Sequence, residues 1–217
     1  MPKHHDWQTM SSARNIRHAL ASFLDEPALA PALAAVLDKC RGRSGVPYEE
    51  IATAAGDEAA ELILLAWDWR LLLPRRSSQC AEWDDRILAL EAGEIYDMAN
   101  IVAYLLDAAA ESGTWDVDDA VRALYAAMHE PHYREMPALV RGICRDAQNG
   151  CINAAKIHTA CTNAGIHGLT GAMIGILKGG GVISPKLMSA SPAEKKGSPV
   201  YEVHPALLAA PGECKAT

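Results

Sequence analysis

The chain has 217 residues and a formal net charge of −7; half of its residues are hydrophobic, but only 6% are aromatic. This length can form one large domain or two small ones with a buried core. No apolar run approaches the roughly 20 residues that a membrane-spanning helix needs, and charges interrupt the N-terminus where a signal peptide would be apolar. We therefore expect no membrane insertion and a cytoplasmic protein whose cysteines are reduced.

The N-terminal part of the chain predicts two helices. Ser11 or Ser12 can cap the first, which we expect to end near Asp25. The second begins between Pro27 and Pro31 and ends at the glycines that follow residue 41. Its apolar residues recur at helical spacing, which predicts a helix with one buried face: Leu29, Ala32, Leu33, Val36, Leu37 and Cys40.

A short helix and a longer one are predicted next. The short helix runs from Tyr48 to Ala55 behind a proline suited to a first turn. The longer one starts after Gly56 with acidic residues, which favour the positive end of a helix dipole. The segment from Arg70 to Leu90 then predicts two short strands around a polar loop.

Residues 93–133 predict a helical hairpin. Apolar residues at helical spacing occur in two runs, and Ser112-Gly113 separates them. Asp116 is expected to cap the second helix, and Pro131 closes it.

The C-terminal part repeats the order of elements predicted for residues 26–92. A helix beginning at Pro137 ends at Asn149-Gly150, and a short helix and a longer one follow. The longer helix is expected from about Gly168 to Gly179, with Leu169, Ala172, Met173, Ile176 and Leu177 on its buried side. A glycine break then leads into two strand-like runs joined by a polar loop that contains lysines.

The two parts also share short sequence motifs, which predicts an internal repeat. Each has a helix beginning with Pro-Ala-Leu, then Ile-x-Thr-Ala, then an apolar pair followed by proline and a basic residue. The corresponding segments are Pro31–Leu33, Ile51–Ala54 and Leu72–Arg75 in the first part and Pro137–Leu139, Ile157–Ala160 and Ile183–Lys186 in the second.

This order of helix, turn, helix, glycine break and two strands, with Cys151 to His204 as its clearest example, resembles the winged helix-turn-helix superfamily. The resemblance implies a mainly α fold with small β wings, in which a helical hairpin joins two winged-helix modules. The expected parts are an N-terminal segment (1–25), the first module (26–92), the hairpin (93–133), the second module (134–210) and a tail (211–217).

Charge is distributed unevenly between these parts. Residues 1–133 contain 11 Lys and Arg and 22 Asp and Glu (11 − 22 = −11), whereas residues 134–217 contain 9 and 5 (9 − 5 = +4). An anionic partner would therefore favour the second module. The resemblance implies that its longer helix faces DNA, and the candidate DNA-binding residues are Lys156, His167, Thr170, Lys178, Lys186, Lys195 and Lys196.

The exposed side predicted for this longer helix carries few groups that read bases. Thr170, Gly171, Ile174, Gly175 and Lys178 face outward, and none of them is an Arg, Asn or Gln. Two glycines and an isoleucine suit close approach to another surface at least as well. The lysines indicate phosphate contacts that do not depend on base sequence.

Cysteine and histidine residues gather in the second module. Cys144, Cys151, His158, Cys161 and His167 are all possible ligands of zinc or an iron–sulfur centre. Their spacing matches no compact metal motif, and Cys144 and Cys161 fall on apolar helical stripes, where cysteine behaves as a small hydrophobe. A core role is the main expectation, and a metal or redox site is the alternative.

No catalytic site and no cofactor are predicted. His129-Glu130-Pro131-His132 lacks the two histidines at i and i+4 that a zinc protease needs, and Gly179–Gly181 follows a helix, unlike phosphate-binding loops. The leading hypothesis is a DNA-binding transcriptional regulator whose acidic part forms a homodimer or binds a partner protein. The alternatives are a tandem winged-helix scaffold subunit and a regulator that senses metal or redox state.

Overall fold

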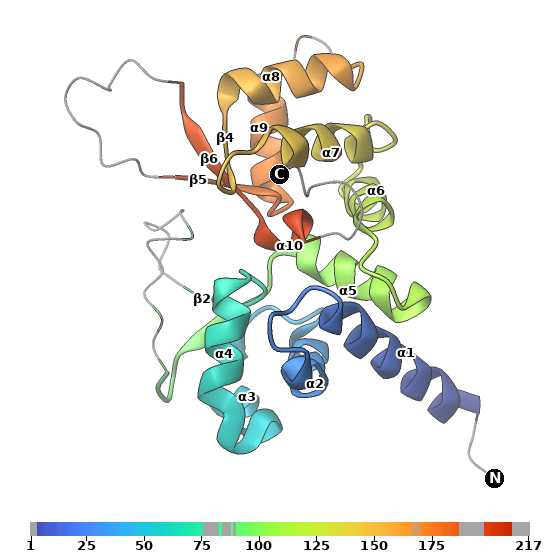
Figure 1. The fold of residues 1–217 in the computed structure, drawn as a ribbon, viewed down its shortest axis with the longest axis vertical. Coiled ribbons are helices and arrows are strands. Elements are labelled where there is room, and N and C mark those ends of the chain that lie inside the picture. The colour runs from blue at the N-terminus through green and yellow to red at the C-terminus, as the bar shows by residue number, and fades with distance from the viewer. Residues whose placement is uncertain are drawn as a thin grey trace.

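The structure is a computed structural model that describes residues 4–75, 83, 88, 90–166, 168, 170–186 and 198–209, with the backbone alone for residues 4–10. It is mainly helical, with 60% of the described residues in helices, and these residues form two small antiparallel sheets. The expectation of a mainly α fold with small β elements is therefore confirmed. The two sheets lie in opposite halves of the molecule, with helices α5 (Asn100–Ser112) and α10 (Pro205–Leu208) between them (Figure 1).

The first half combines four helices with a three-stranded sheet of order β1-β3-β2. Helix α1 packs on α2 and on the hairpin helix α5. The elements are α1 (His4–Ala21), η1 (Pro27–Leu29), α2 (Ala30–Cys40), β1 (Val46–Pro47), α3 (Tyr48–Ala55), η2 (Gly56–Glu58), α4 (Ala59–Asp68), β2 (Leu73–Pro74) and β3 (Ile95–Asp97).

The second half has a sheet of the same order, β4-β6-β5. Its helix α7 packs on α8, and α8 packs on α9. The elements are α7 (Met136–Asp146), β4 (Cys151–Asn153), α8 (Ala154–Asn163), α9 (Thr170–Gly179), β5 (Ile183–Pro185), β6 (Val200–Val203) and α10 (Pro205–Leu208).

Strand pairing in the two sheets follows the same register. In the first sheet, Tyr96 of β3 lies opposite Val46 on one side and Pro74 on the other. In the second sheet, Tyr201 of β6 lies opposite Ile152 and Pro185. The proline of the shared motif, Pro74 in the first half and Pro185 in the second, therefore occupies the same strand position in both halves.

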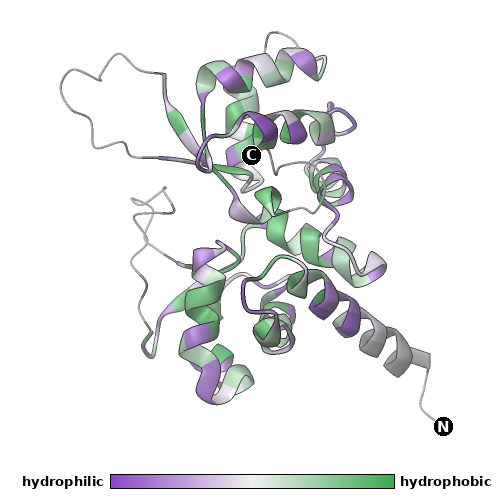
Figure 2. Ribbon diagram, in the orientation of Figure 1, coloured by the Kyte–Doolittle hydropathy of each residue, from purple (hydrophilic) through white to green (hydrophobic). Residues whose placement is uncertain are grey.

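The hairpin helices α5 (Asn100–Ser112) and α6 (Val117–Ala127) pack on each other, and α6 continues the contact to α7. Gly113 turns the chain with a φ of 76°, a value that glycine adopts without steric strain. The Asp116 side chain accepts a hydrogen bond from the Asp119 backbone, which confirms the predicted cap. Apolar residues are concentrated along α5 at the centre of the molecule (Figure 2), where one continuous core links both halves.

Three local predictions are wrong. Helix α1 begins at His4, so Ser11 and Ser12 lie inside it and do not cap it. The strand partner of β2 was expected before Leu90, in a segment that is largely outside the described residues; the observed partner is Ile95–Asp97. On α9, only Met173 and Leu177 are buried, and Ala172, predicted to be buried, is exposed because the core meets a narrower face of this helix.

None of the described helices combines the length and the hydropathy that crossing a bilayer requires.

Candidate interaction site

Helix α9 exposes a strip with almost no side chains. Gly171 lies in the first turn of the helix and Gly175 in its middle; both are exposed, and neither has a positive φ. Among the described residues, no atom outside the local helix backbone lies within 4 Å of the position that a Cβ would occupy on either glycine. Glycine in an exposed helix interior is about 1 kcal/mol less favourable than alanine, and among the described residues no close contact explains Gly175.

Two of the residues predicted to contact DNA are bonded inside the chain. Lys156 Nζ donates to the Asp146 carbonyl oxygen at 2.9 Å, where a cation also suits the negative end of helix α7. Thr170 Oγ1 lies 2.7 Å from His158 Nδ1, within hydrogen-bonding distance. Each of these two side chains therefore already has one hydrogen-bonding partner within the chain.

Of the other predicted DNA-binding residues, Lys178 and Lys186 lie within the described structure. Lys178 is exposed in the last turn of α9, and no ion pair to it is found within the described ranges. Lys186 follows β5, and its backbone N–H donates to the Val200 carbonyl oxygen at 3.0 Å. His167, Lys195 and Lys196 lie outside the described residues.

Four of the five cysteine and histidine candidates lie within the described structure. Cys144 and Cys161 are buried, and burial raises the pKa of the Cys161 thiol. Cys151 is half-buried at the start of β4, His158 is exposed beside Thr170, and His167 lies outside the described residues. The part of the chain that the structure describes contains no group of three or more His, Cys, Asp or Glu residues placed to hold a metal ion.

Helix α4 has the same place in the first half as α9 in the second, but its exposed face is different. Leu64 is 45% exposed, which makes it one of the most exposed large apolar residues described. Glu61 and Asp68 are exposed on the same side of the helix. This face therefore combines an apolar centre with two acidic ends.

Both long helices end in the same hydrogen-bonded turn. Leu71 N–H donates to the Ala66 carbonyl oxygen after α4, and Val182 N–H donates to the Leu177 carbonyl oxygen after α9. Such a turn needs one residue with positive φ. The second half uses Gly181 (φ 75°), whereas the first half uses Arg70 (φ 55°), for which this backbone conformation is strained.

Arg70 connects the two halves. Its Nε donates to Glu202 Oε1 at 3.3 Å, and the Arg70 and Glu202 side chains are only 11% and 13% exposed. The guanidinium also lies over the Trp67 ring, 4.9 Å from its centroid, and donates to the Trp67 carbonyl oxygen at 3.3 Å. The strained backbone at Arg70 therefore places a cation where it joins α4 to strand β6.

His204 binds the same turn from the other half. Its Nε2 lies 3.1 Å from the Arg70 carbonyl oxygen, and its Nδ1 accepts a hydrogen bond from the Ala206 N–H at 3.3 Å. Because Nδ1 accepts, Nε2 is the donor to Arg70. The ring is fully buried, and this burial lowers the pKa of His204 to about 4, so the imidazole is neutral near pH 7.

The turn after α9 contacts the start of the hairpin helix α5, which follows the last strand of the first half. The Gly180 carbonyl oxygen accepts from the Ile101 N–H at 2.9 Å, and the Gly179 carbonyl oxygen accepts from Asn100 Nδ2 at 3.1 Å. The turn after α4 thus bonds to His204, which follows β6, and the turn after α9 bonds to Asn100 and Ile101, which follow β3. These reciprocal contacts hold the two halves in one arrangement.

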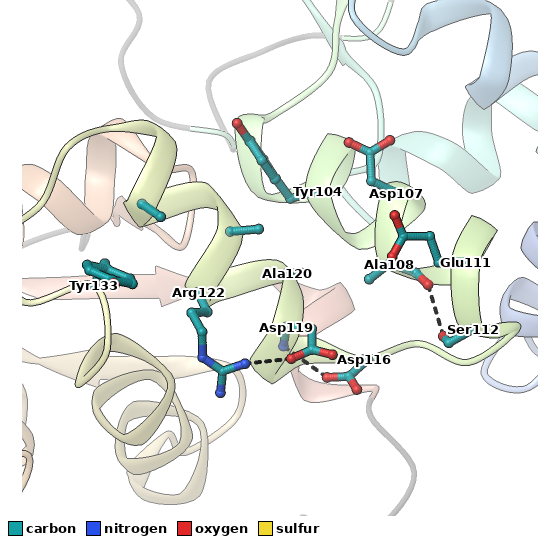
Figure 3. A pocket seen from close by; sticks show the side chains of 12 residues that line it. Tyr104, Asp107, Ala108, Glu111, Ser112, Asp116, Asp119, Ala120, Arg122 and Tyr133 are labelled. Atoms are coloured by element: carbon teal, nitrogen blue, oxygen red, sulfur yellow. Dashed lines mark hydrogen bonds and ion pairs between the residues drawn. The ribbon is translucent and has the colours of Figure 1, made fainter.

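A hollow of about 440 Å³ lies on the hairpin, away from α4 and α9 (Figure 3). Tyr104 and Tyr133 form part of its wall, together with alanines of α5 and α6. Asp119 at its edge is paired with Arg122 at 2.6 Å, and Asp116 is occupied as the helix cap. The hollow has an acidic rim whose carboxylates are in part already bonded.

Comparison with known proteins places the chain in a family. A protein-family model matches residues 15–210. The chain belongs to this family. The family has no established function. Neither the curated proteins nor the solved structures contain a match to the chain.

Sequence reasoning did not find Arg70, Glu202 or His204. The signal was present in the internal repeat, because Arg70 stands where the second half has Gly181. An arginine at a position that calls for glycine indicates a specific contact. The identity of its partner, 132 residues away, depends on how the halves pack.

Proposed function

We propose that the chain consists of two winged-helix modules and acts as an adaptor that binds protein surfaces through the exposed faces of α4 and α9. The order of helices and strands in each half and the matching strand registers support the two modules. The hairpin α5 and α6 joins them. This proposal differs from the sequence-based hypothesis of a DNA-reading regulator in what the long helices contact.

The exposed face of α9 carries this proposal. A helix that reads bases needs side chains such as Arg, Asn or Gln, and α9 contains none of them. Its exposed strip at Gly171 and Gly175 instead allows another backbone or a large side chain to approach closely. Leu64 on α4 is the kind of apolar side chain that becomes buried in a protein interface.

The junction supports the same function. The Arg70–Glu202 pair and the His204 hydrogen bond fix the direction of α4 relative to α9. Because the two binding faces are held at a fixed angle, they can bind one partner together without losing further conformational entropy when each face binds.

The test compares capture of cellular proteins by the tagged full-length chain and by two face variants, Leu64→Glu and Gly175→Glu. We expect at least one protein that the wild-type chain enriches and that both variants lose. Leu90→Glu changes an exposed leucine elsewhere and should leave the capture intact. Equal protein profiles for the wild type and both face variants would overturn the adaptor proposal.

DNA binding through phosphates is a second candidate function, favoured by the +4 charge of residues 134–217 and by the exposed Lys178. The proposal predicts binding to mixed-sequence duplex DNA that weakens steeply with salt and does not depend on sequence. Fluorescence anisotropy titrations at two salt concentrations, with Lys178→Glu as the variant, test it. An affinity that is undetectable at low salt would remove this candidate.

A further inference from the structure

The exposed faces of α4 and α9 are complementary in shape. Leu64 projects from α4 as a largely exposed side chain at the middle of the helix. Gly175 leaves open space at the middle of α9, because no described atom would meet a Cβ there. An exposed leucine alone needs no explanation, and neither does an isolated surface glycine. Together, the Leu64 side chain and the open space at Gly175 provide one chain with a projecting group and a place where such a group can be accommodated.

The same two faces are complementary in charge. Glu61 and Asp68 lie three residues before and four residues after Leu64, and within the described ranges neither forms an ion pair. On α9, Lys178 lies three residues after Gly175 and Gly171 lies four residues before it. The order of intervals between the three exposed residues of α4, three and then four residues, is therefore reversed between the three exposed residues of α9.

We propose that α4 of one copy docks antiparallel on α9 of a second copy of this chain. This inference rests on the proposed function and names the partner of the same faces. With Leu64 seated on Gly175, Glu61 lies opposite Lys178 and Asp68 lies opposite Gly171. Both helices rise about 4.5 Å over three residues and about 6 Å over four, so all three pairs align at once.

The spacing and the helix dipoles favour the antiparallel direction. It places Glu61 directly opposite the Lys178 ammonium and brings Asp68 to the first turn of α9, where the helix dipole favours an anion. In the parallel direction, Asp68 would lie beside Lys178 and Glu61 beside the first turn of α9, each shifted along the helix by about 1.5 Å, the rise of one residue. The antiparallel direction also sets the two helix dipoles in opposition, which stabilises the pair.

The charge of each half points to the same partner. Residues 1–133 have a net charge of −11 and residues 134–217 have +4, so the half that contains α4 attracts the half that contains α9 (11 − 22 and 9 − 5). Within one chain the junction holds the two helices in separate halves (Figure 1). Contact between these faces must therefore form between copies.

Sedimentation velocity of the purified full-length chain over a range of concentrations tests the proposal. We expect the wild type to self-associate and each charge reversal, Glu61→Lys or Lys178→Glu, to weaken association roughly tenfold. The double variant Glu61→Lys/Lys178→Glu exchanges the charges and should restore association relative to both single variants. Circular dichroism and thermal unfolding confirm that each variant is folded.

The matched controls are Glu111→Lys on α5 and Lys39→Glu on α2, two exposed charges outside the proposed interface. They change the net charge by the same amounts and should not weaken association. A wild type that stays monomeric throughout, or single reversals that behave like these controls, would overturn the inference. If the chain is monomeric but the two face variants still lose a captured cellular protein, the adaptor function stands and only the identity of the partner is wrong.

Discussion

Helices α4 and α9 occupy the same place in two similar halves but expose different residues. Counting back from the shared turn at Arg70 and Gly181, Leu64 corresponds to Gly175 and Ala60 to Gly171. The buried positions agree in character, since Leu62 corresponds to Met173 and both are buried. The core has kept one fold in both halves, while the exposed positions have become distinct surfaces.

The ends of the last strands show the same contrast. Asp97 and Glu202 hold equivalent positions in β3 and β6, next to Tyr96 and Tyr201. Asp97 pairs with Arg75 within its own half at 2.6 Å, at the surface. Glu202 pairs instead with Arg70 of the other half, where both side chains are nearly buried. Asp97 therefore joins two strands within its own sheet, and Glu202 joins the two halves.

The largest predicted effect comes from breaking the buried pair. Glu202→Ala leaves the Arg70 guanidinium nearly buried without its carboxylate, and this should lower the free energy of unfolding by about 3 kcal/mol. For a chain of this size the Tm should fall by roughly 6–12 °C. Asp97→Ala removes the equivalent exposed pair and should lower the Tm far less. Differential scanning calorimetry compares them, and equal shifts would contradict a role of Glu202 at the junction.

Protonation of His204 should weaken the junction at acidic pH. Burial lowers the pKa of His204 from 6.5 to about 4, so between these values the unfolded chain binds a proton that the folded chain excludes. The contribution of His204 to stability is therefore largest above pH 6.5 and should fall by about 2 kcal/mol between pH 6.5 and about 4.5. The charged groups at this site are the guanidinium of Arg70 and its partner Glu202.

Urea unfolding at several pH values, for the wild type and for His204→Gln, isolates this contribution. The glutamine keeps an amide donor for the Arg70 carbonyl oxygen and does not titrate. The variant should lose the part of the pH dependence that the histidine supplies. A wild-type profile parallel to that of the variant would show that His204 titrates normally.

The sequence predicted the repeated elements well because local signals define them. Prolines at helix starts, glycines at helix ends and apolar residues at helical spacing located α2, α3, α7 and the hairpin. The internal repeat was visible because Ile51 and Ile157, both buried, lie in the same motif. Such features depend on neighbours in the chain, and one sequence is enough to recognise them.

The junction and strand β3 could not be predicted in the same way. The sequence predicted the second strand of this region before Leu90, but the observed strand is Ile95–Asp97. The bonds of Arg70 to Glu202 and His204 join residues more than a hundred positions apart. They depend on how two finished halves meet, and no local pattern encodes that arrangement.

A smaller effect is expected at Gly180, whose equivalent in the first half is Trp69. A Cβ on Gly180 would lie 2.7 Å from Tyr125 Oη and 3.1 Å from Leu124 Cδ2. Gly180→Ala should therefore lower the free energy of unfolding by about 1–2 kcal/mol through overpacking. Tyr125→Phe removes the closest atom, which is a buried hydroxyl without a hydrogen-bond partner among the described residues. Alone it should be nearly neutral, and in the double variant it should recover part of the loss.

The smallest effect tests the contrast between Leu64 and Gly175 directly. Gly175→Ala adds a methyl group where no described atom lies within 4 Å, so it should raise the free energy of unfolding by up to about 1 kcal/mol through helix propensity. Urea unfolding of the dilute chain measures this gain, and Gly171→Ala should behave alike. At higher concentration the same methyl group would stand where Leu64 of a second copy is proposed to sit, and association should weaken. A chain that gains stability without losing association would show that the glycines of α9 serve no interface.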